Sequence, residues 1–235
     1  MQDSLIKSVI FDLDNTLYDF SYSNEFALNA LREYTKKNFG WTAEEFDEKH
    51  LASQHEIYSQ LGYNGSCRDR MLRYQKMLER SSLSFFPHAV NMYELYWNTL
   101  IHSVSPHEGA EEVMKALKNI GIKIGIGSDM IPYIQMLKLE RMELLRYVDF
   151  MVTSEEAGEE KPSEKFFQMC LNKAGFEKTE CLFLGDDFRK DYEGAKNFGM
   201  RALWFNKNDK PGEVKEQIKT LREVLDFLSS SSWKN

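Results

Sequence analysis

Cysteine is scarce in this 235-residue sequence, and the three that occur, Cys67, Cys170 and Cys181, form no close pair. An odd number of separated cysteines favours neither a disulfide framework nor a cysteine-based zinc site, so we expect free thiols. No apolar run approaches the roughly 20 residues that a membrane span needs. The N-terminus also lacks the charged and then apolar pattern of a secretory signal. These absences predict a cytoplasmic protein with no membrane partner.

Positive charge is also in short supply. The 30 Lys and Arg residues are outnumbered by 37 Asp and Glu residues, which leaves a formal net charge of -7. Binding to nucleic acid rests on neutralising phosphates with Lys and Arg, so we expect no nucleic-acid partner. If the substrate is anionic, a metal ion or a few placed cations must compensate its charge locally.

The sequence does contain short apolar, β-branched or aromatic runs separated by helix-length segments, which is typical of an α/β protein with a parallel sheet. Capping residues and glycines predict the helices between the later strands. We therefore expect a Rossmann-like core with helices on both faces of the sheet. The predicted strands are 8–12, 122–127, 150–153, 181–185 and 202–205, and the predicted helices are 106–121, 162–175, 187–199 and 213–228.

The stretch from residue 19 to residue 100 breaks this alternation, because it has helical periodicity and no strand run. Helices fit residues 24–39, 42–62, 66–80 and 88–101. We interpret the stretch as an all-helical domain inserted after the first strand. The predicted domains are therefore a catalytic core of residues 1–18 and 101–235 and a helical domain of residues 19–100.

Acidic residues follow several of the predicted strands. In open parallel sheets ligands bind beyond the carboxyl ends of the strands, so these side chains are expected to meet. Clustered carboxylates repel one another, and a divalent cation relieves the repulsion; oxygen ligands favour magnesium over zinc or copper. The residues at these ends are Asp12, Asp14, Thr16, Ser128, Asp129, Asp186, Asp187 and Asp191, with Lys161 ahead of a predicted helix.

These residues resemble the motifs of the haloacid dehalogenase-like (HAD) superfamily, and specifically of its phosphatase branch. Four motifs occur in order, and each lies at a predicted strand end or ahead of a helix. The helical insertion between the first two motifs is similar to the small cap domain of that family. The motifs are Asp12-x-Asp14-x-Thr16, then Ser128, then Lys161, and finally Gly185-Asp186-Asp187 with Asp191.

The resemblance implies a phosphatase that acts on a small phosphomonoester, such as a nucleotide or a sugar phosphate. Asp12 would attack phosphorus and form an aspartyl-phosphate, and Asp14 would act as general acid and base. The Asp12 carboxylate, the main-chain carbonyl of Asp14 and Asp186 would hold Mg²⁺. Ser128, Thr16 and Lys161 would bind the phosphoryl group, and Asp187 and Asp191 would support the others.

Two departures bear on this assignment. Dehalogenases of the family carry no acid at the position of Asp14, so Asp14 argues against dehalogenation. Asp129 stands where the family more often has an uncharged residue. Its position after Ser128 counts it among the substrate-binding residues, but a carboxylate beside the phosphate is unfavourable, so we expect its side chain to face away.

Structural explanations remain open for single residues. An Asp-x-Asp pair can be a capped turn, Ser128 can cap a helix, Lys161 can be a surface lysine, and Asp187 and Asp191 can flank a helix.

In the insertion, Phe85-Phe86-Pro87 and the stripe from Tyr93 to Leu100 are predicted to be core. Arg68, Arg70 and Arg73 lie on one predicted helix. We interpret them as a solvated face, with contact to an anionic substrate tail as the alternative.

Two other functions remain alternatives at this point. A phosphomutase uses the same aspartyl-phosphate but needs a cap that excludes water, and it usually lacks a hydroxyl like that of Thr16. A receiver-type signalling module also places acids and a lysine around magnesium, but it is about half this length and has no helical insertion. The oligomeric state is left open between monomer and homodimer.

Overall fold

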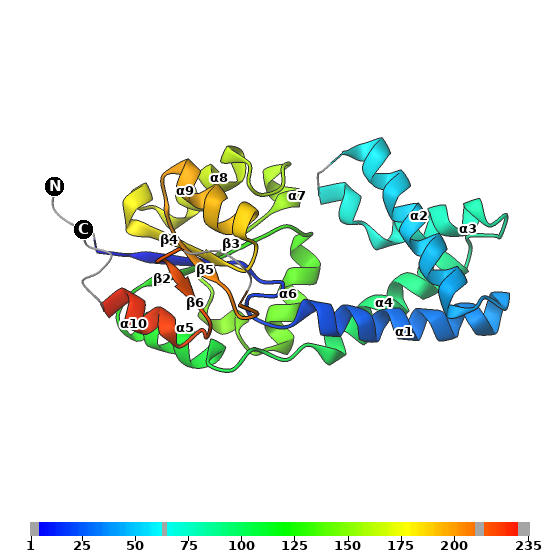
Figure 1. Ribbon diagram of the computed structural model, residues 1–235, viewed down its shortest axis with the longest axis horizontal. Helices are drawn as coiled ribbons and strands as arrows, with labels where there is room; N and C mark the ends of the chain where they lie inside the picture. The colour runs from blue at the N-terminus through cyan, green and yellow to red at the C-terminus, as the bar shows by residue number, and fades with distance from the viewer. Residues whose placement is uncertain (1–4, 63–64, 210–213, 230–235) are drawn as a thin grey trace. The chain divides into compact units, whose positions relative to one another are not determined.

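The computed structural model describes residues 5–62, 65–209 and 214–229 and divides into two compact units (Figure 1). Met1–Asp19 and Ser105–Asn235 form the sheet unit, and Phe20–Val104 form the helical unit. The chain therefore leaves the sheet unit once and returns to it. The predicted boundaries of 18/19 and 100/101 lie one and four residues earlier, since the last helix of the insertion continues to Ser103.

A six-stranded parallel sheet forms the centre of the sheet unit, with the order β3-β2-β1-β4-β5-β6. All five predicted strands are present, and a short sixth strand lies at the edge beside β5. The bounds are β1 Ser8–Phe11, β2 Lys123–Ser128, β3 Phe150–Thr153, β4 Cys181–Gly185, β5 Arg201–Phe205 and β6 Gln217–Ile218. Strand β1 lies between β2 and β4, so the residues that follow these three strands are brought together at one edge.

Helices cover both faces of this sheet, which confirms the predicted fold class. Helices α8 (Glu164–Ala174) and α9 (Gly194–Phe198) cover one face, and α5 (Ala110–Asn119) lies against the other beside α10 (Glu223–Ser229) (Figure 1). Side chains of Phe166, Phe167 and Phe183 form the centre of the core on the α8 side. The three free cysteines are buried, as expected of structural thiols.

Two helices of this unit were not predicted. Helix α6 (Pro132–Arg141) begins with Pro132 in its first turn and packs near β3, and α7 (Ser154–Ala157) is a single turn after that strand. A proline at a helix start is a usual signal. The segment that contains α6 has no glycine at its end, so the sequence offered no clear stop.

The predicted helix 213–228 is wrong over its first half. Residue 213 lies outside the described residues, Gln217–Ile218 form β6, and helix α10 begins only at Glu223. The backbone N–H of Asn206 donates to the carbonyl of Ile218 over 2.8 Å, so pairing with β5 holds this segment extended. Similarly, α5 begins at Ala110 rather than at Pro106, because Pro106 bridges to Tyr18 instead.

The helical unit contains α1 (Phe20–Phe39), α2 (Ala43–Leu61), α3 (Arg70–Arg80) and α4 (His88–Ser103). Helix α2 starts at a capping box, in which Thr42 and Glu45 bind each other's backbone N–H. Tyr96, Trp97 and Leu100 of α4 are buried, as predicted. Phe85 and Phe86 were predicted to be core as well, but they are 49% and 68% exposed.

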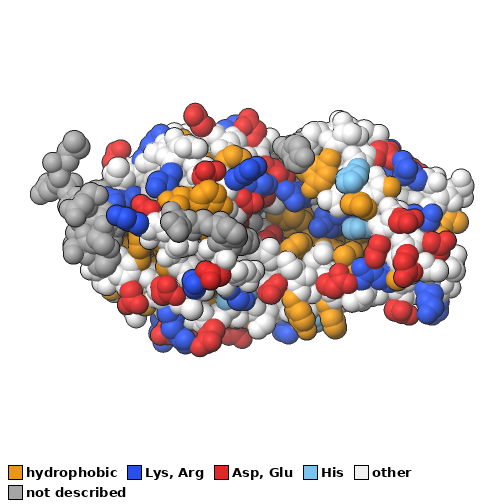
Figure 2. Space-filling model, viewed as in Figure 1, with side chains coloured by type: hydrophobic (Ala, Val, Ile, Leu, Met, Phe, Trp, Pro, Cys, Tyr) orange, Lys and Arg blue, Asp and Glu red, His pale blue; other side chains and the backbone are white. Residues whose placement is uncertain are grey.

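The surface carries charge of both signs. Acidic and basic side chains are scattered over the face that Figure 2 shows, with smaller apolar areas between them. Throughout the described ranges, every helix is too short or too polar to cross a lipid bilayer.

Candidate active site

A tight turn follows β1 and begins the site. Asp12 continues the strand, since its backbone N–H donates to the carbonyl of Leu184 over 2.8 Å. The chain then turns back, because the N–H of Leu17 donates to the carbonyl of Leu13 over 3.0 Å. Asn15 lies within this turn with a φ of 64°, a left-handed conformation that asparagine tolerates better than most residues.

Lys161 is buried at the carboxyl ends of the strands and contacts three separate segments of the chain. Its Nζ donates to Asp12 Oδ1 over 2.6 Å, to Asp191 Oδ1 over 2.7 Å and to the Gly127 carbonyl over 3.2 Å. Lys161 is 4% exposed, so it is not a solvated surface lysine. The other oxygen of Asp12 accepts a hydrogen bond of 3.1 Å from the Thr16 hydroxyl, which itself accepts one from the N–H of Asp186.

Burial and mutual repulsion perturb the pKa values of this cluster. Burial raises the pKa of Asp12 to about 7, with a further rise from Asp191 and an opposing effect of Lys161. Burial also raises the pKa of Asp191. Burial alone would lower the pKa of Lys161, but the negative charges of Asp12 and Asp191 raise it well above its ordinary value, so Lys161 stays charged. Asp12 and Asp191 therefore share the ammonium of Lys161.

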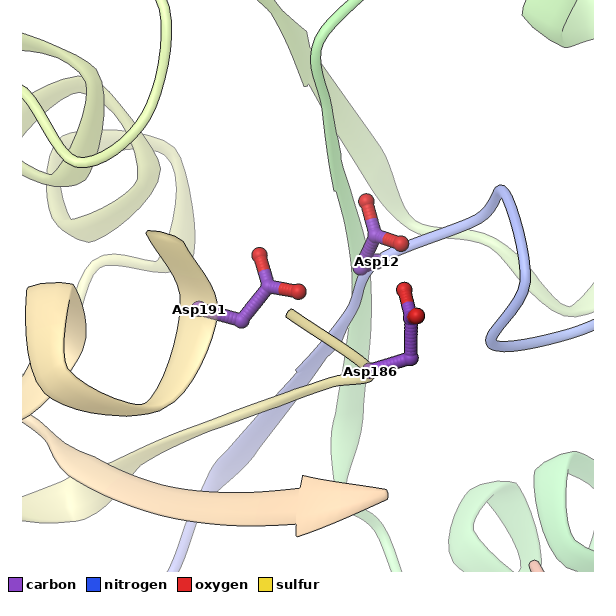
Figure 3. A group of neighbouring side chains, drawn as sticks. All are labelled: Asp12, Asp186 and Asp191. Carbon is purple, nitrogen blue, oxygen red and sulfur yellow. The ribbon is translucent and has the colours of Figure 1, made fainter. Parts of the chain in front are cut away.

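Three carboxylates converge beside Lys161 and could hold a metal ion. Oxygen atoms of Asp12, Asp186 and Asp191 lie within 4.8 Å of one another. Figure 3 shows that Asp12 follows β1, Asp186 follows β4 and Asp191 comes from the helical turn η4 (Phe188–Glu193), with their carboxyl groups turned toward one another. Their ligand atoms are all carboxylate oxygens, and a divalent cation offsets the repulsion between such groups. The oxygen-only donor set therefore fits Mg²⁺.

Asp191 and Asp187 are both engaged with neighbouring backbone. Asp191 Oδ2 accepts a hydrogen bond of 3.0 Å from the N–H of Asp187, while Oδ1 is bound by Lys161. Asp187 Oδ1 accepts from the N–H groups of Arg189 and Lys190 and caps η4. Asp187 is exposed, in line with its interpretation as a capping residue.

Asp14 lies in a separate environment on the other side of the turn. Lys138 Nζ donates to Asp14 Oδ1 over 2.7 Å, Tyr18 donates to the same oxygen over 2.5 Å, and Gln135 Nε2 donates to Oδ2 over 3.2 Å. Burial raises the pKa of Asp14, but these donors, Lys138 foremost, outweigh it and lower the pKa overall. Asp14 and Asp12 therefore have opposite pKa shifts although only one residue separates them.

Gln135 and Lys138 were not among the candidate site residues, because α6 itself was not predicted. They lie three residues apart, so they share a helix face, and both are fully buried. Gln135 also donates to the Ser128 hydroxyl over 2.6 Å. The sequence did contain a signal for this helix face, because Gln135 and Lys138 are spaced i, i+3 and follow Pro132, a residue type common at helix starts.

Asp129 does not face away, contrary to expectation. Its Oδ1 accepts a hydrogen bond of 2.9 Å from the backbone N–H of Lys161, and its Oδ2 accepts one of 2.8 Å from Lys190. Lys190 also pairs with Glu160. Asp129 thereby fixes the loop that carries Lys161.

Each of the nine sequence-predicted site residues lies at this edge of the sheet. Asp12, Thr16, Lys161, Asp186 and Asp191 are connected through the contacts above. Asp14 and Ser128 are joined to each other through Gln135, and Asp129 and Asp187 bind backbone N–H groups of the surrounding loops.

The chain is similar to a family model, to named enzymes and to solved structures. Residues 9–205 match the family model described as haloacid dehalogenase-like hydrolase. A ribulose-1,5-bisphosphate 5-phosphatase of Halopiger xanaduensis is 29% identical over 94% of this chain and 99% of its own. A pyrimidine 5'-nucleotidase of Escherichia coli is 29% identical over 84% of this chain and 85% of its own. The crystal structure of an HAD phosphatase from Thermococcus onnurineus is similar with a TM-score of 0.74 and 26% identity, over 95% of this chain and 98% of that one.

Proposed function

Because the chain belongs to the haloacid dehalogenase-like hydrolase family and is a phosphoric monoester hydrolase, we propose that it cleaves its substrate in two steps through an aspartyl-phosphate on Asp12. The observation that carries the proposal is the Lys161 cluster, in which one ammonium holds the Asp12 carboxylate at 2.6 Å inside a buried, acid-rich edge.

Asp12 is the nucleophile in this proposal. Its carboxylate attacks phosphorus, a new P–O bond forms, and the bond from phosphorus to the ester oxygen breaks. Lys161 and the Thr16 hydroxyl hold the two oxygens of Asp12, so the carboxylate reaches the reaction already oriented. The ammonium of Lys161 also offsets the repulsion between a carboxylate and a phosphate dianion.

Asp14 is the acid and base. The first step uses the protonated form of Asp14, a minor form at neutral pH because its pKa is lowered, and this form gives its proton to the departing ester oxygen. In the second step it takes a proton from the water that attacks phosphorus, and the bond to Asp12 breaks as phosphate leaves. Lys138, Tyr18 and Gln135 hold its carboxyl group in one orientation.

A magnesium ion at this site would supply charge neutralisation for the phosphoryl group and orient it toward Asp12. The residues proposed to hold it are Asp12, Asp186 and the main-chain carbonyl of Asp14. Asp191, which also lies in the converging group, has both oxygens engaged by Lys161 and the Asp187 backbone. We therefore assign Asp191 to the positioning of Lys161.

The substrate class we propose is a small phosphomonoester, either a sugar phosphate or a nucleotide. The names of the relatives support this range, since one acts on ribulose-1,5-bisphosphate and another on pyrimidine nucleotides. The helical unit is proposed to be the cap domain that selects the leaving group. Named phosphatases among the relatives favour hydrolysis over a phosphomutase or a signalling module.

The test is a screen of sugar phosphates and nucleoside monophosphates with the wild-type protein and with Asp12→Asn. Wild type is expected to release phosphate with Mg²⁺, to stop in EDTA and to recover when Mg²⁺ returns. Asp12→Asn is expected to be inactive. The control is Asp209→Asn, which removes an equal charge from a side chain that is 76% exposed and should act as wild type.

The intermediate itself can be trapped by reducing the acyl phosphate with borohydride during turnover. Mass spectrometry should then find homoserine in place of Asp12. Equal activity in wild type and Asp12→Asn would exclude the covalent role, and full activity in EDTA would exclude the magnesium requirement.

A further inference from the structure

Two arginines of α3, Arg70 and Arg73, are buried inside the helical unit. They are 9% and 3% exposed, so the interpretation of this helix face as solvated is wrong for both. The reason is that the arginine face of α3 is turned inward, toward aromatic side chains of its neighbours. Tyr74 of the same helix is fully buried beside them.

Few acceptors meet the guanidinium groups. Each guanidinium has five N–H donors. Among residues 5–62, 65–209 and 214–229, however, Arg70 donates only to the Arg68 carbonyl over 3.2 Å and to the Tyr96 hydroxyl over 3.4 Å. Arg73 meets His50 Nε2 over 3.5 Å. The Nε atoms of both arginines and the hydroxyl of Tyr74 are buried without a hydrogen-bond partner among the described residues. Within the described part of the chain, most of the N–H donors of Arg70 and Arg73 therefore have no acceptor.

No carboxylate in the described part of the chain lies within 4.0 Å of either guanidinium. The acids of this region have other partners: Asp69 caps α3 through the N–H of Met71, and Glu56 pairs with Arg80. Arg70 instead lies over the ring of Tyr96, with 5.2 Å between Cζ and the ring centroid. A cation–π contact stabilises a buried guanidinium by less than the cost of burying an ion without a counterion.

The positive charges of Arg70 and Arg73 shift the pKa values of neighbouring groups. Burial, followed by the charges of Arg73, Arg70 and Arg32, lowers the pKa of His50 to about 3, so its ring is neutral. Burial and the charge of Arg70 lower the pKa of Arg73 to about 10. Burial also acts to lower the pKa of Arg70, but interactions with Tyr96 and Tyr74 outweigh it and raise that pKa overall. Both guanidinium groups are therefore charged at neutral pH.

We propose that Arg70 and Arg73, with the Tyr74 hydroxyl, bind the phosphate or carboxylate group of a small molecule inside the helical unit. An oxyanion supplies both missing elements at once, since it provides negative charge and several acceptors in a geometry that guanidinium groups match. The site shares no residue with the Asp12 and Lys161 cluster. Its ligand is either a second acidic group of the substrate or a free anion.

Thermal unfolding of the full chain with inorganic phosphate tests the site. An anion that binds the folded state raises the unfolding temperature as its concentration rises. We expect a saturable increase for wild type in EDTA. In Arg73→Gln and Arg70→Gln, we expect phosphate affinity to fall roughly ten- to hundredfold, because a charge-assisted hydrogen bond is lost in each.

The matched control is Arg80→Gln, which removes the same charge from α3 at a side chain that is 55% exposed. It must keep the wild-type response, and this also accounts for any phosphate bound by the sheet unit. If Arg73→Gln does not fold, Arg73→Lys replaces it, and a lysine that cannot form the fork must also weaken the response. An undiminished response in either Arg73 variant overturns the proposal.

Kinetics then identify the source of the anion. We compare a phosphomonoester that carries a second phosphate or carboxylate with one whose leaving group is neutral. A KM that rises in Arg73→Gln only for the doubly acidic ester assigns the site to the substrate; unchanged KM values for both, with the thermal response lost, assign it to a free anion. The kinetic arm rests on the proposed phosphatase activity, whereas the thermal arm needs no turnover, so failure of one is distinguishable from failure of the other.

Discussion

Gly185 at the end of β4 leaves room for Asp191, and replacing it with alanine should disrupt the Lys161 cluster. A Cβ atom at this position would lie 2.2 Å from Asp191 Oδ2, 2.4 Å from its Cγ and 2.7 Å from its Cβ. The Asp191 side chain would have to move. Its contacts with Lys161 and with the N–H of Asp187 would then be lost.

The cost follows from these contacts. Overpacking costs about 1–3 kcal/mol, and breaking a buried ion pair costs about 3–5 kcal/mol. Lys161 keeps its bonds to Asp12 and Gly127, so the lower part of this range applies, about 4 kcal/mol in total. For a chain of this size, that lowers the unfolding temperature by roughly 8–16 °C. Displacement of Lys161 should also lower kcat/KM by about a hundredfold.

The assay is thermal unfolding by calorimetry together with phosphate release. The control is Gly121→Ala, because Gly121 has a φ of 78° and nothing within 4 Å of an added Cβ. That variant meets only the backbone cost of about 1–2 kcal/mol and should keep its activity.

A double variant identifies Asp191 as the group that clashes. Combining Gly185→Ala with Asp191→Gly removes all three clashing atoms, so the two single effects should sum to more than the double variant loses. Strict additivity, or equal effects of Gly185→Ala and Gly121→Ala, would refute the reasoning.

Three more outcomes are expected. Lys138→Met should lower kcat about tenfold or more with little change in KM, because Asp14 loses the charged donor that orients it; unchanged kcat would remove Lys138 from the positioning of Asp14. Because the pKa of His50 is lowered to about 3 in the folded state, only the unfolded chain takes up a proton as pH falls below about 6.5, and folding loses up to about 2 kcal/mol between pH 6.5 and pH 5. His50→Gln should shrink this acid-dependent fall in unfolding temperature in phosphate-free buffer, and an identical fall in both proteins would contradict it. Burial raises the pKa of the thiols of Cys170 and Cys181, so iodoacetamide at pH 8 should label them only after unfolding; labelling in the native protein, seen by mass spectrometry, would contradict their burial.

The sequence alone determined the sheet and the chemistry of its edge. Strand-length apolar runs that end in Asp12 and Asp186 predict buried parallel strands, and parallel strands place their carboxyl ends together whatever the details of packing. Lys161 precedes a predicted helix, so its convergence with these acids followed from the order of the elements. The cytoplasmic location and the choice between monomer and homodimer stay predictions.

Only the tertiary structure decided which polar side chains are buried and what they meet. Gln135 and Lys138 reach Asp14 because α6 packs near β3, and no spacing in the sequence links residues more than 120 positions apart. The segment at Ile218 is extended because β5 offers it backbone partners. Arg70 and Arg73 have the spacing of an exposed helix face, yet both side chains are buried. The periodicity of a sequence shows which residues share a helix face, whereas the neighbouring elements decide whether that face is covered.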